Sequence, residues 1–408
     1  MNLPVVAREG GVSHLYLHVP FCRNHCSYCD YAVTTERPPA EGVWRDALAE
    51  ELRLRGGVGL LSSPLATVLV GGGTPSTLGP RLAGAVRALV GSERIDGAEE
   101  WTIEANPEDV TCELLEGWRR AGVTRPGLGV QSLQASVLAW LGRAHGPGEG
   151  RDALRRVSQS GFPTWSVDLL YGLPGHLDSR PLDSLREVVA AGAPHISVYE
   201  LVAEPGTRVN VRSPTAVSPA PGPGSGPGPG PAGDQAREPE ADDRAATEYL
   251  EISAFLHSEG YEAWEMMSFA RPGHASRHGL GVLRGESFVG LGPGAHSRHL
   301  GRARWNLRDW QRYWMSLKAG RIPEEGAERI GAAAGRLESI WAGLRLSEGV
   351  SADGLTPAAR EIVAYWSRIG LAREDATRVA LTPEGWLRLD ELVVALDGVM
   401  TPEEPEDG

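Results

Sequence analysis

Short segments rich in β-forming apolar residues alternate with amphipathic segments along the first half of this chain, and this alternation constrains the fold most. Strands are predicted at residues 13–19, 67–70, 101–105, 128–130, 164–171 and 195–201. Helices are predicted between them, where Trp44, Leu48 and Leu52 share one face, near 111–118 and near 181–191. One strand and one helix repeat about every thirty residues, as in βαβ units. Because such crossovers are right-handed, the sequence predicts an α/β fold whose parallel sheet closes partly into a barrel.

The remainder of the chain is organised differently. The run PAPGPGSGPGPGPAGD has almost no apolar side chain to offset its ordering entropy, so a disordered insertion is predicted around it. Helices are then predicted at 245–259, 308–319, 332–343 and 358–369 and from residue 383, with a short strand at 378–381. We therefore expect a barrel (1–212), the insertion (213–244), the remainder of the barrel with a further segment (245–304), and a smaller, mainly helical C-terminal domain resembling a winged helix (305–408).

Composition limits the compartment and the partners. Four cysteines in 408 residues argue against a secreted disulfide scaffold and for a reducing compartment. No apolar stretch approaches the roughly 20 residues of a membrane-spanning helix, and residues 1–11 contain no run typical of a signal peptide. A net charge of -13 disfavours nucleic acid as a partner, because phosphate binding requires a basic face. We expect a cytoplasmic protein without a transmembrane segment.

Three of the four cysteines, Cys22, Cys26 and Cys29, fall within eight residues. Thiolates bind iron-sulfur clusters, zinc or copper(I), and three of them can converge on one inorganic centre if the loop wraps around it. Three ligands leave one coordination position open for an exogenous ligand. A 4Fe-4S cluster is the favoured interpretation. A zinc knuckle completed by His25 and a chance group of buried cysteines are the alternatives.

Glycines and polar residues recur where the predicted strands end. The segment GGGTPS at 71–76 follows one strand, and its glycines would let the backbone approach a ligand closely. Glu104, Gln131 and Asp168 lie at the ends of three other strands, and a charged residue there is costly unless it is paired or faces a polar cavity. Arg143 is long enough to bind a carboxylate with two hydrogen bonds. The sequence therefore predicts a polar cavity at this end of the barrel, although a tight turn and solvated side chains would explain each feature singly.

Seven segments occur in the order found in the HemN/HemW-like group of the radical S-adenosylmethionine (SAM) superfamily, which this chain resembles: YLHVPFCRNHCSYC (16–29), VGGGTPS (70–76), IEANPE (103–108), GVQSLQ (129–134), DLLYGLPG (168–175), YELVAEPGT (199–207) and GLGPGAHS (290–297). The resemblance implies an incomplete (β/α)6 barrel and a 4Fe-4S cluster on Cys22, Cys26 and Cys29, with SAM bound at the free iron. It also implies a set of SAM-contacting residues, namely Tyr16, Gly72, Gly73, Glu104, Gln131, Arg143 and Asp168.

Two branches of this group differ just after the cysteines. Oxygen-independent coproporphyrinogen III oxidases carry a further cysteine two residues after the third, where this chain has Tyr31. Cys112 lies too far along the chain to replace it and is expected to be a small buried residue. The segments LESIWAGLRLSEGVS (337–351) and LTPEGWLRLDE (381–391) instead resemble HemW-type heme chaperones.

Membership of the chaperone branch implies binding of heme or porphyrin, transfer of heme to a client hemoprotein, and an electron donor. Oxidative decarboxylation of coproporphyrinogen III is the enzymatic alternative, so whether the chain is an enzyme is left open. A zinc-bound structural protein is a third hypothesis.

HemW-type proteins carry a His-Asn-x-x-Tyr-Trp motif associated with heme, which HGLGVL at 278–283 matches in part. His278 is retained and is a candidate axial ligand of heme. The two aromatic residues are absent, which removes apolar contact with a porphyrin. His296 is a second candidate, for heme or for SAM. A histidine in a surface loop is the plainer interpretation of His278.

Overall fold

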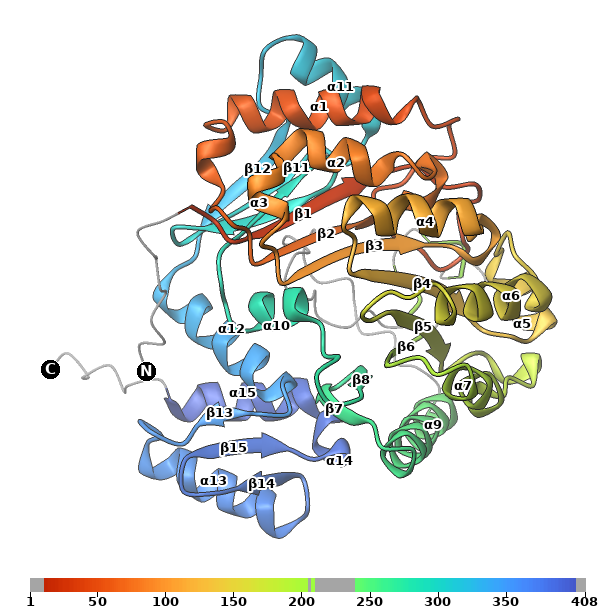
Figure 1. Cartoon of the computed structure of the whole chain (residues 1–408). Helices are drawn as coiled ribbons and strands as arrows, with labels where there is room; N and C mark the ends of the chain where they lie inside the picture. The colour runs from red at the N-terminus through yellow and green to blue at the C-terminus, as the bar shows by residue number, and fades with distance from the viewer. Residues whose placement is uncertain (1–10, 205–206, 210–238, 401–408) are drawn as a thin grey trace, which may run out of the picture.

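A twelve-stranded sheet forms the centre of the molecule (Figure 1). The computed structural model describes residues 11–204, 207–209 and 239–400. Six strands run parallel in sequence order: β1 (His14–Val19), β2 (Thr67–Gly72), β3 (Glu100–Ala105), β4 (Arg125–Gln131), β5 (Ser166–Tyr171) and β6 (His195–Glu200). The predicted α/β fold with a parallel sheet is confirmed.

Helices cover the outer face of these strands (Figure 1): α1 (Glu41–Leu54), α2 (Leu82–Val90), α3 (Ser92–Ile95), α4 (Cys112–Ala121), α5 (Ala135–Leu141), α6 (Pro147–Ser158), α7 (Pro181–Ala190) and α9 (Pro239–Ser258). Side chains alternate between the two faces of a strand. In β1, Leu15, Leu17 and Val19 are buried in the core shared with the helices. The intervening residues, among them Tyr16 and His18, therefore face the inside of the barrel, which is polar.

The sheet continues beyond the parallel strands on both sides. β9 (Phe288–Leu291) pairs in parallel with β1, and β10 (His296–His299), β11 (Arg302–Asn306) and β12 (Glu324–Arg329) follow in antiparallel order. On the other side β6 pairs with β8 (Ser268–Ala270), and β8 pairs with β7 (Glu262–Glu265). β12 and β7 are the two edges, so the barrel is incomplete, as expected.

The strands from β7 to β12 were not predicted, because the sequence indicated no strand between residues 201 and 378. The sequence of β12, EEGAER, is mostly exposed and lacks the apolar alternation of a half-buried strand. Its position depends on backbone pairing with β11 rather than on burial. Two further helices belong to this part of the chain: α10 (Arg277–Leu283) precedes β9, and α11 (Trp310–Lys318) lies between β11 and β12.

The C-terminal part is mainly helical and contains a small sheet, as predicted. Its elements are α12 (Ala332–Arg345), β13 (Val350–Ser351), α13 (Pro357–Arg368), β14 (Ala372–Glu374), β15 (Arg378–Leu381), α14 (Pro383–Trp386) and α15 (Leu389–Met400). The strands pair in the order β13-β15-β14. The indole of Trp386 is buried and donates a hydrogen bond to the Leu344 carbonyl at 3.0 Å, which ties α14 to α12.

Helix α9 begins at Pro239, earlier than the predicted start at residue 245. The rest of the predicted insertion, through residue 238, lies outside the described residues. Within the described ranges, no helix is long and apolar enough to cross a membrane.

Candidate cofactor site

The loop between β1 and α1 carries the three clustered cysteines at the carboxyl end of the parallel strands. Backbone hydrogen bonds define its path. The Cys22 amide donates to the Thr34 carbonyl at 3.0 Å, and the Ser27 amide donates to the Leu141 carbonyl at 2.9 Å. The Ser27 carbonyl accepts from the Val209 amide at 2.9 Å. The loop is thus tied to its own return segment, to α5 and to the segment after β6, and all three thiols are free.

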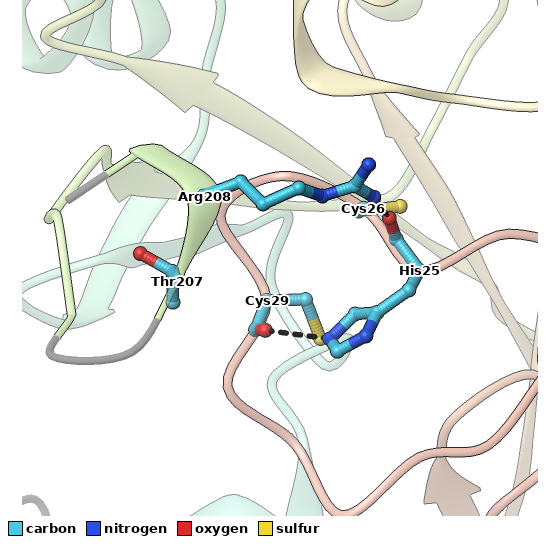
Figure 2. Close-up of a pocket in the computed structure, with 5 residues that line it drawn as sticks. All are labelled: His25, Cys26, Cys29, Thr207 and Arg208. Carbon is cyan, nitrogen blue, oxygen red and sulfur yellow. Dashed lines mark hydrogen bonds between the residues drawn. The ribbon is translucent and has the colours of Figure 1, made fainter. Parts of the chain in front are cut away.

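A cavity of about 420 Å³ lies beside this loop, lined by His25, Cys26, Cys29, Thr207 and Arg208 (Figure 2). The Arg208 guanidinium donates to the His25 carbonyl, and His25 Nε2 lies 3.1 Å from the Cys29 carbonyl oxygen. This nitrogen of His25 therefore faces the backbone of its own loop. Among the described residues, no three His, Cys, Asp or Glu side chains are gathered around one metal position. Binding of a cluster would therefore require the three thiols to move closer together.

The protonation of the thiols fits a metal site. Burial raises the pKa of Cys22 to about 11 and that of Cys29 to about 12. Both thiols are therefore protonated at neutral pH unless a cation binds nearby. Metal binding deprotonates its cysteine ligands and supplies the positive charge that the buried thiolates lack. The donor set is therefore compatible with a cationic centre held by thiolates.

The glycines that end β2 lie where a side chain would not fit. A Cβ atom at Gly73 would stand 3.0 Å from Cys22 Sγ. A Cβ atom at Gly72, whose φ is +104°, would stand 2.4 Å from His18 Nδ1. Glycine is required here because the chain packs directly against the cysteine loop and β1. The contact of Gly72 and Gly73 with SAM remains a prediction.

Two carboxylates, Glu104 on β3 and Asp168 on β5, face the inside of the barrel. Burial and the nearby Asp168 raise the pKa of Glu104 to about 8. Burial raises the pKa of Asp168 to about 6, against an opposing hydrogen bond with Ser197. At neutral pH Glu104 is therefore mainly protonated and can both donate and accept hydrogen bonds. Both side chains are only partly buried, and their contact with SAM remains a prediction.

Two tyrosines, Tyr16 and Tyr31, lie near these carboxylates. The Tyr16 hydroxyl is 2.9 Å from His18 Nδ1, and His18 Nε2 is 2.9 Å from the Ala32 carbonyl oxygen. This chain of contacts holds the segment after the cysteines over the barrel. Tyr31 is 62% exposed, yet burial and Glu104 raise the pKa of its phenol. Both observations are explained if the ring projects into the barrel mouth, where water reaches it although protein surrounds it.

Arg143 and Gln131 meet beside the cysteine loop. Arg143 Nη1 is 3.6 Å from Cys26 Sγ, and Nη2 donates to Asn106 Oδ1 at 2.8 Å and to the Gly129 carbonyl at 2.6 Å. Gln131 ends β4 with a φ of +65°. A Cβ atom at Gly129 would lie 3.3 Å from Gln131 Nε2 and 3.2 Å from Asn106 Oδ1. The structure therefore brings these two predicted SAM-contacting residues together next to the cysteine loop.

The two candidate heme histidines lie at opposite ends of the barrel. His278, in α10, is 7% exposed, and its Nδ1 is 2.7 Å from Thr67 Oγ1 at the amino end of β2. His278 is therefore not a surface-loop histidine. His296 begins β10 near the carboxyl end of β1 and stacks on Trp305 at 6.1 Å between ring centroids. A six-residue strand spans about 20 Å, so one heme cannot use both histidines.

A second cavity, of about 410 Å³, opens at the amino end of the barrel. Its lining includes His14, Arg277, Leu280, Gly281, Arg284 and Glu286. His14 rather than His278 belongs to this lining, and the His14 side chain is 4% exposed. His14 Nε2 is 3.0 Å from Glu286 Oε2, and Nδ1 is 2.8 Å from Thr67 Oγ1. The Thr67 hydroxyl thus lies between the two imidazoles.

Five residues in or around the site were not among the predicted site residues: Thr74, Asn106, Glu108, His145 and Arg208. The Thr74 hydroxyl donates to Cys22 Sγ at 3.3 Å. Asn106 and Glu108 belong to the segment IEANPE, in which Asn106 was interpreted only as the end of a strand. The short helix η3 (Pro107–Asp109) turns both residues toward the loop. Asn106 and Glu108 lie two positions apart just after a strand end, and this spacing was the sequence feature that could have indicated them.

Cys112 is exposed, and the expectation of a buried residue is wrong. It is the first residue of α4, where Leu114, Leu115 and Trp118 form the buried side. Helical side chains tilt toward the helix N-terminus, so the side chain of this first residue extends past the start of α4 into solvent.

Comparisons with known proteins agree with the site. The pattern of the Radical SAM superfamily matches residues 16–188. The chain is 35% identical to the heme chaperone HemW of Mycobacterium tuberculosis over 94% of each chain. It is 31% identical to the heme chaperone HemW of Escherichia coli, covering 70% of this chain and 69% of that protein.

The solved structure of the E. coli coproporphyrinogen III oxidase HemN, a radical SAM enzyme, superimposes with a TM-score of 0.73. It covers 96% of this chain and 92% of that one at 20% identity, a likeness that shows the fold alone. The resemblance seen in the sequence motifs is thereby confirmed. The chain belongs to the HemW family of heme chaperones, within the radical SAM superfamily.

Proposed function

We propose that Cys22, Cys26 and Cys29 bind a 4Fe-4S cluster and that SAM binds at its free iron. Support comes from three free thiols on one loop and from hydrogen-bond donors beside two of them. A bound cluster supplies one electron at a time to its partner. SAM would contact the residues Tyr16, Gly72, Gly73, Glu104, Gln131, Arg143 and Asp168.

The residues of the barrel would orient SAM and limit its exposure to water. Glu104, which is mainly protonated at neutral pH, can donate to one ligand oxygen and accept from a ligand hydroxyl. Asp168, whose pKa is near 6, can accept from hydroxyl or amino groups. Tyr31 would cover the mouth of the barrel. These roles require no movement of the strands that carry the carboxylates.

We infer that the chain is a cytoplasmic heme chaperone that receives heme and passes it to a client hemoprotein, with an electron donor serving the cluster. The names of the relatives, heme chaperones, indicate heme as the ligand. The observation that carries the proposal is Tyr31, because a phenol at the barrel mouth replaces the further cysteine that marks the coproporphyrinogen oxidases. Decarboxylation of coproporphyrinogen III is the outcome that would contradict it.

For the heme itself we propose the cavity at the amino end of the barrel. His14 belongs to the lining of this cavity, and its Nε2 can serve as an iron ligand once Glu286, which lies 3.0 Å from it, moves aside. Arg277 and Arg284, which also line the cavity, can bind the two propionates. His278 would act through Thr67 by holding the His14 ring.

Anaerobic reconstitution followed by heme titration tests both parts. The wild-type protein should take up iron and sulfide, show an iron-sulfur absorption band and bind heme with a saturable Soret band. His14→Ala should abolish or strongly weaken heme binding without changing iron content, and His278→Ala should weaken it less. Turnover of coproporphyrinogen III together with formation of 5'-deoxyadenosine would establish the enzymatic alternative instead.

A further inference from the structure

Asn106 connects the residues that touch two of the three clustered cysteines. Its Oδ1 accepts from Arg143 Nη2 at 2.8 Å, and Arg143 Nη1 is 3.6 Å from Cys26 Sγ. Its Nδ2 donates to Thr74 Oγ1 at 3.3 Å, and the Thr74 hydroxyl donates to Cys22 Sγ at 3.3 Å. The Asn106 side-chain amide is therefore hydrogen-bonded to both Thr74 and Arg143, the two residues that donate to the cysteine sulfurs.

The chemistry of the partners fixes the direction of these hydrogen bonds. An arginine can only donate, so the oxygen of the Asn106 amide must face Arg143. The amide nitrogen then faces Thr74 and Glu108, to whose Oε1 it donates at 3.3 Å. Because Thr74 Oγ1 accepts from this nitrogen, its own proton is free to point at Cys22 Sγ. Both sulfurs consequently receive a donor.

A buried pair, His145 and Glu108, adjoins the Asn106 amide, which donates to Glu108. His145 Nε2 lies 3.2 Å from the Val130 carbonyl oxygen, which can only accept, so this nitrogen must carry a proton. His145 Nδ1 lies 3.3 Å from Glu108 Oε2, and the side chains are 0% and 7% exposed. Neither of these two atoms has a hydrogen-bond partner unless a proton lies between them. One hydrogen bond between these two atoms would satisfy both of them. Although burial opposes it, this contact with His145 helps hold the pKa of Glu108 below its usual range.

We propose that this network, running from His145 and Glu108 through Asn106 to Thr74 and Arg143, raises the reduction potential of the cluster bound at Cys22 and Cys26. Hydrogen bonds and positive charge at cluster sulfurs stabilise the more negative reduced state. Thr74 supplies a neutral donor and Arg143 a charged one. Asn106, Glu108 and His145 are positioning residues. The inference rests on the proposed cluster site but not on heme binding.

A redox titration of the reconstituted protein tests the network. Thr74→Val keeps the size of the side chain and removes the donor, whereas Thr74→Ser restores the hydroxyl. At a fixed solution potential, we expect the ratio of reduced to oxidised cluster to fall by about tenfold in Thr74→Val. This corresponds to a decrease of about 59 mV in the reduction potential for one electron. Asn106→Leu should lower the ratio further, because it removes the hydrogen bonds that hold both Thr74 and Arg143. Thr74→Ser should recover the wild-type value.

The matched control is Thr77→Val. Thr77 lies in the short helix η2 (Pro75–Leu78), which follows Thr74, and its hydroxyl donates to the Thr74 carbonyl at 2.7 Å. Its variant should keep the wild-type ratio. An intact cluster with an unchanged ratio in Thr74→Val would overturn the proposal. Failure of the wild-type protein to assemble any cluster would instead overturn the cluster site itself.

A second measurement needs no cluster. In 15N-labelled protein without iron, the chemical shifts of both ring nitrogens of His145 should show that each takes part in a hydrogen bond, Nε2 to Val130 and Nδ1 to Glu108. In Glu108→Gln the chemical shift of His145 Nδ1 should change, because the carboxylate that faces it is removed. A wild-type His145 whose Nδ1 is bare and unaffected by Glu108→Gln would contradict the direction of the network.

Discussion

Gly281 lies directly against the imidazole of His14: a Cβ atom at Gly281 would stand 2.5 Å from His14 Cε1 and 2.7 Å from Nε2. The glycine gives His14 the room to line the cavity at the amino end of the barrel. Gly279 lies against Trp264 in the same way, with a Cβ position 2.7 Å from the indole Cη2. The glycines of the segment HGLGVL are thus explained by the rings that pack on them.

Gly281→Ala should displace the His14 ring or force α10 away from the sheet. We expect the free energy of unfolding to fall by about 1–3 kcal/mol, as for overpacked buried sites, and heme affinity to fall with it. Urea denaturation and the heme titration measure the two effects. Gly84→Ala in α2, where nothing lies within 4 Å of the new Cβ, is the control and should be neutral or slightly stabilising. Wild-type stability and heme affinity in Gly281→Ala would refute the packing account.

Gly73→Ala should impair cluster assembly more than folding. The added Cβ atom would lie 2.8 Å from the Val19 carbonyl oxygen and 3.0 Å from Cys22 Sγ. We expect the iron content after reconstitution to fall severalfold, measured as iron and sulfide per chain. Gly59→Ala, whose Cβ would meet nothing within 4 Å, should assemble the cluster normally. Full iron content in Gly73→Ala would show that the close approach is not needed.

Glu104→Gln should change how stability depends on pH. The pKa of Glu104 is about 8 in the folded protein against a usual value of 4.5. The native state therefore binds more protons than the unfolded state between these values, and stability falls as pH rises through this range. Glutamine has no proton to release in this range. The free energy of unfolding of the variant should therefore fall by about 1–2 kcal/mol less than that of the wild-type protein between pH 6 and pH 8.

Thermal unfolding of the iron-free protein across this pH range measures the effect of Glu104→Gln. Asp168, whose pKa is raised to about 6, contributes in the same direction but mainly below pH 6. Glu113→Gln, on the exposed side of α4, should keep the wild-type slope. Parallel curves for Glu104→Gln and the wild-type protein would mean that Glu104 is ionised throughout.

The four cysteines should divide into two classes. Serine at Cys22, Cys26 or Cys29 should abolish the iron-sulfur absorption band, since each removes one of three ligands. Cys112→Ser should retain it, because Cys112 is exposed at the start of α4. Iron and sulfide analysis of the four variants checks this division. Loss of the band in Cys112→Ser would assign that thiol to the cluster.

Sequence patterns predicted the parallel strands well, because buried strands such as β1 alternate apolar residues that face the helices with polar residues that face the barrel. β12 could not be predicted, since its charged and exposed residues carry no burial pattern. The cysteine spacing and family segments predicted the site at the carboxyl ends. The network through Asn106 could not be predicted, because it depends on the approach of side chains from β2, β3 and the segment after α5. The same limit applies to His14, a residue that only the fold brings beside His278.

The most direct test of the account is a heme titration of the anaerobically reconstituted protein, followed by mixing with an apo-hemoprotein. The account predicts a saturable Soret band that is lost in His14→Ala, and transfer of that heme to the acceptor. The absence of a saturable Soret band in wild-type protein with an intact cluster would contradict it.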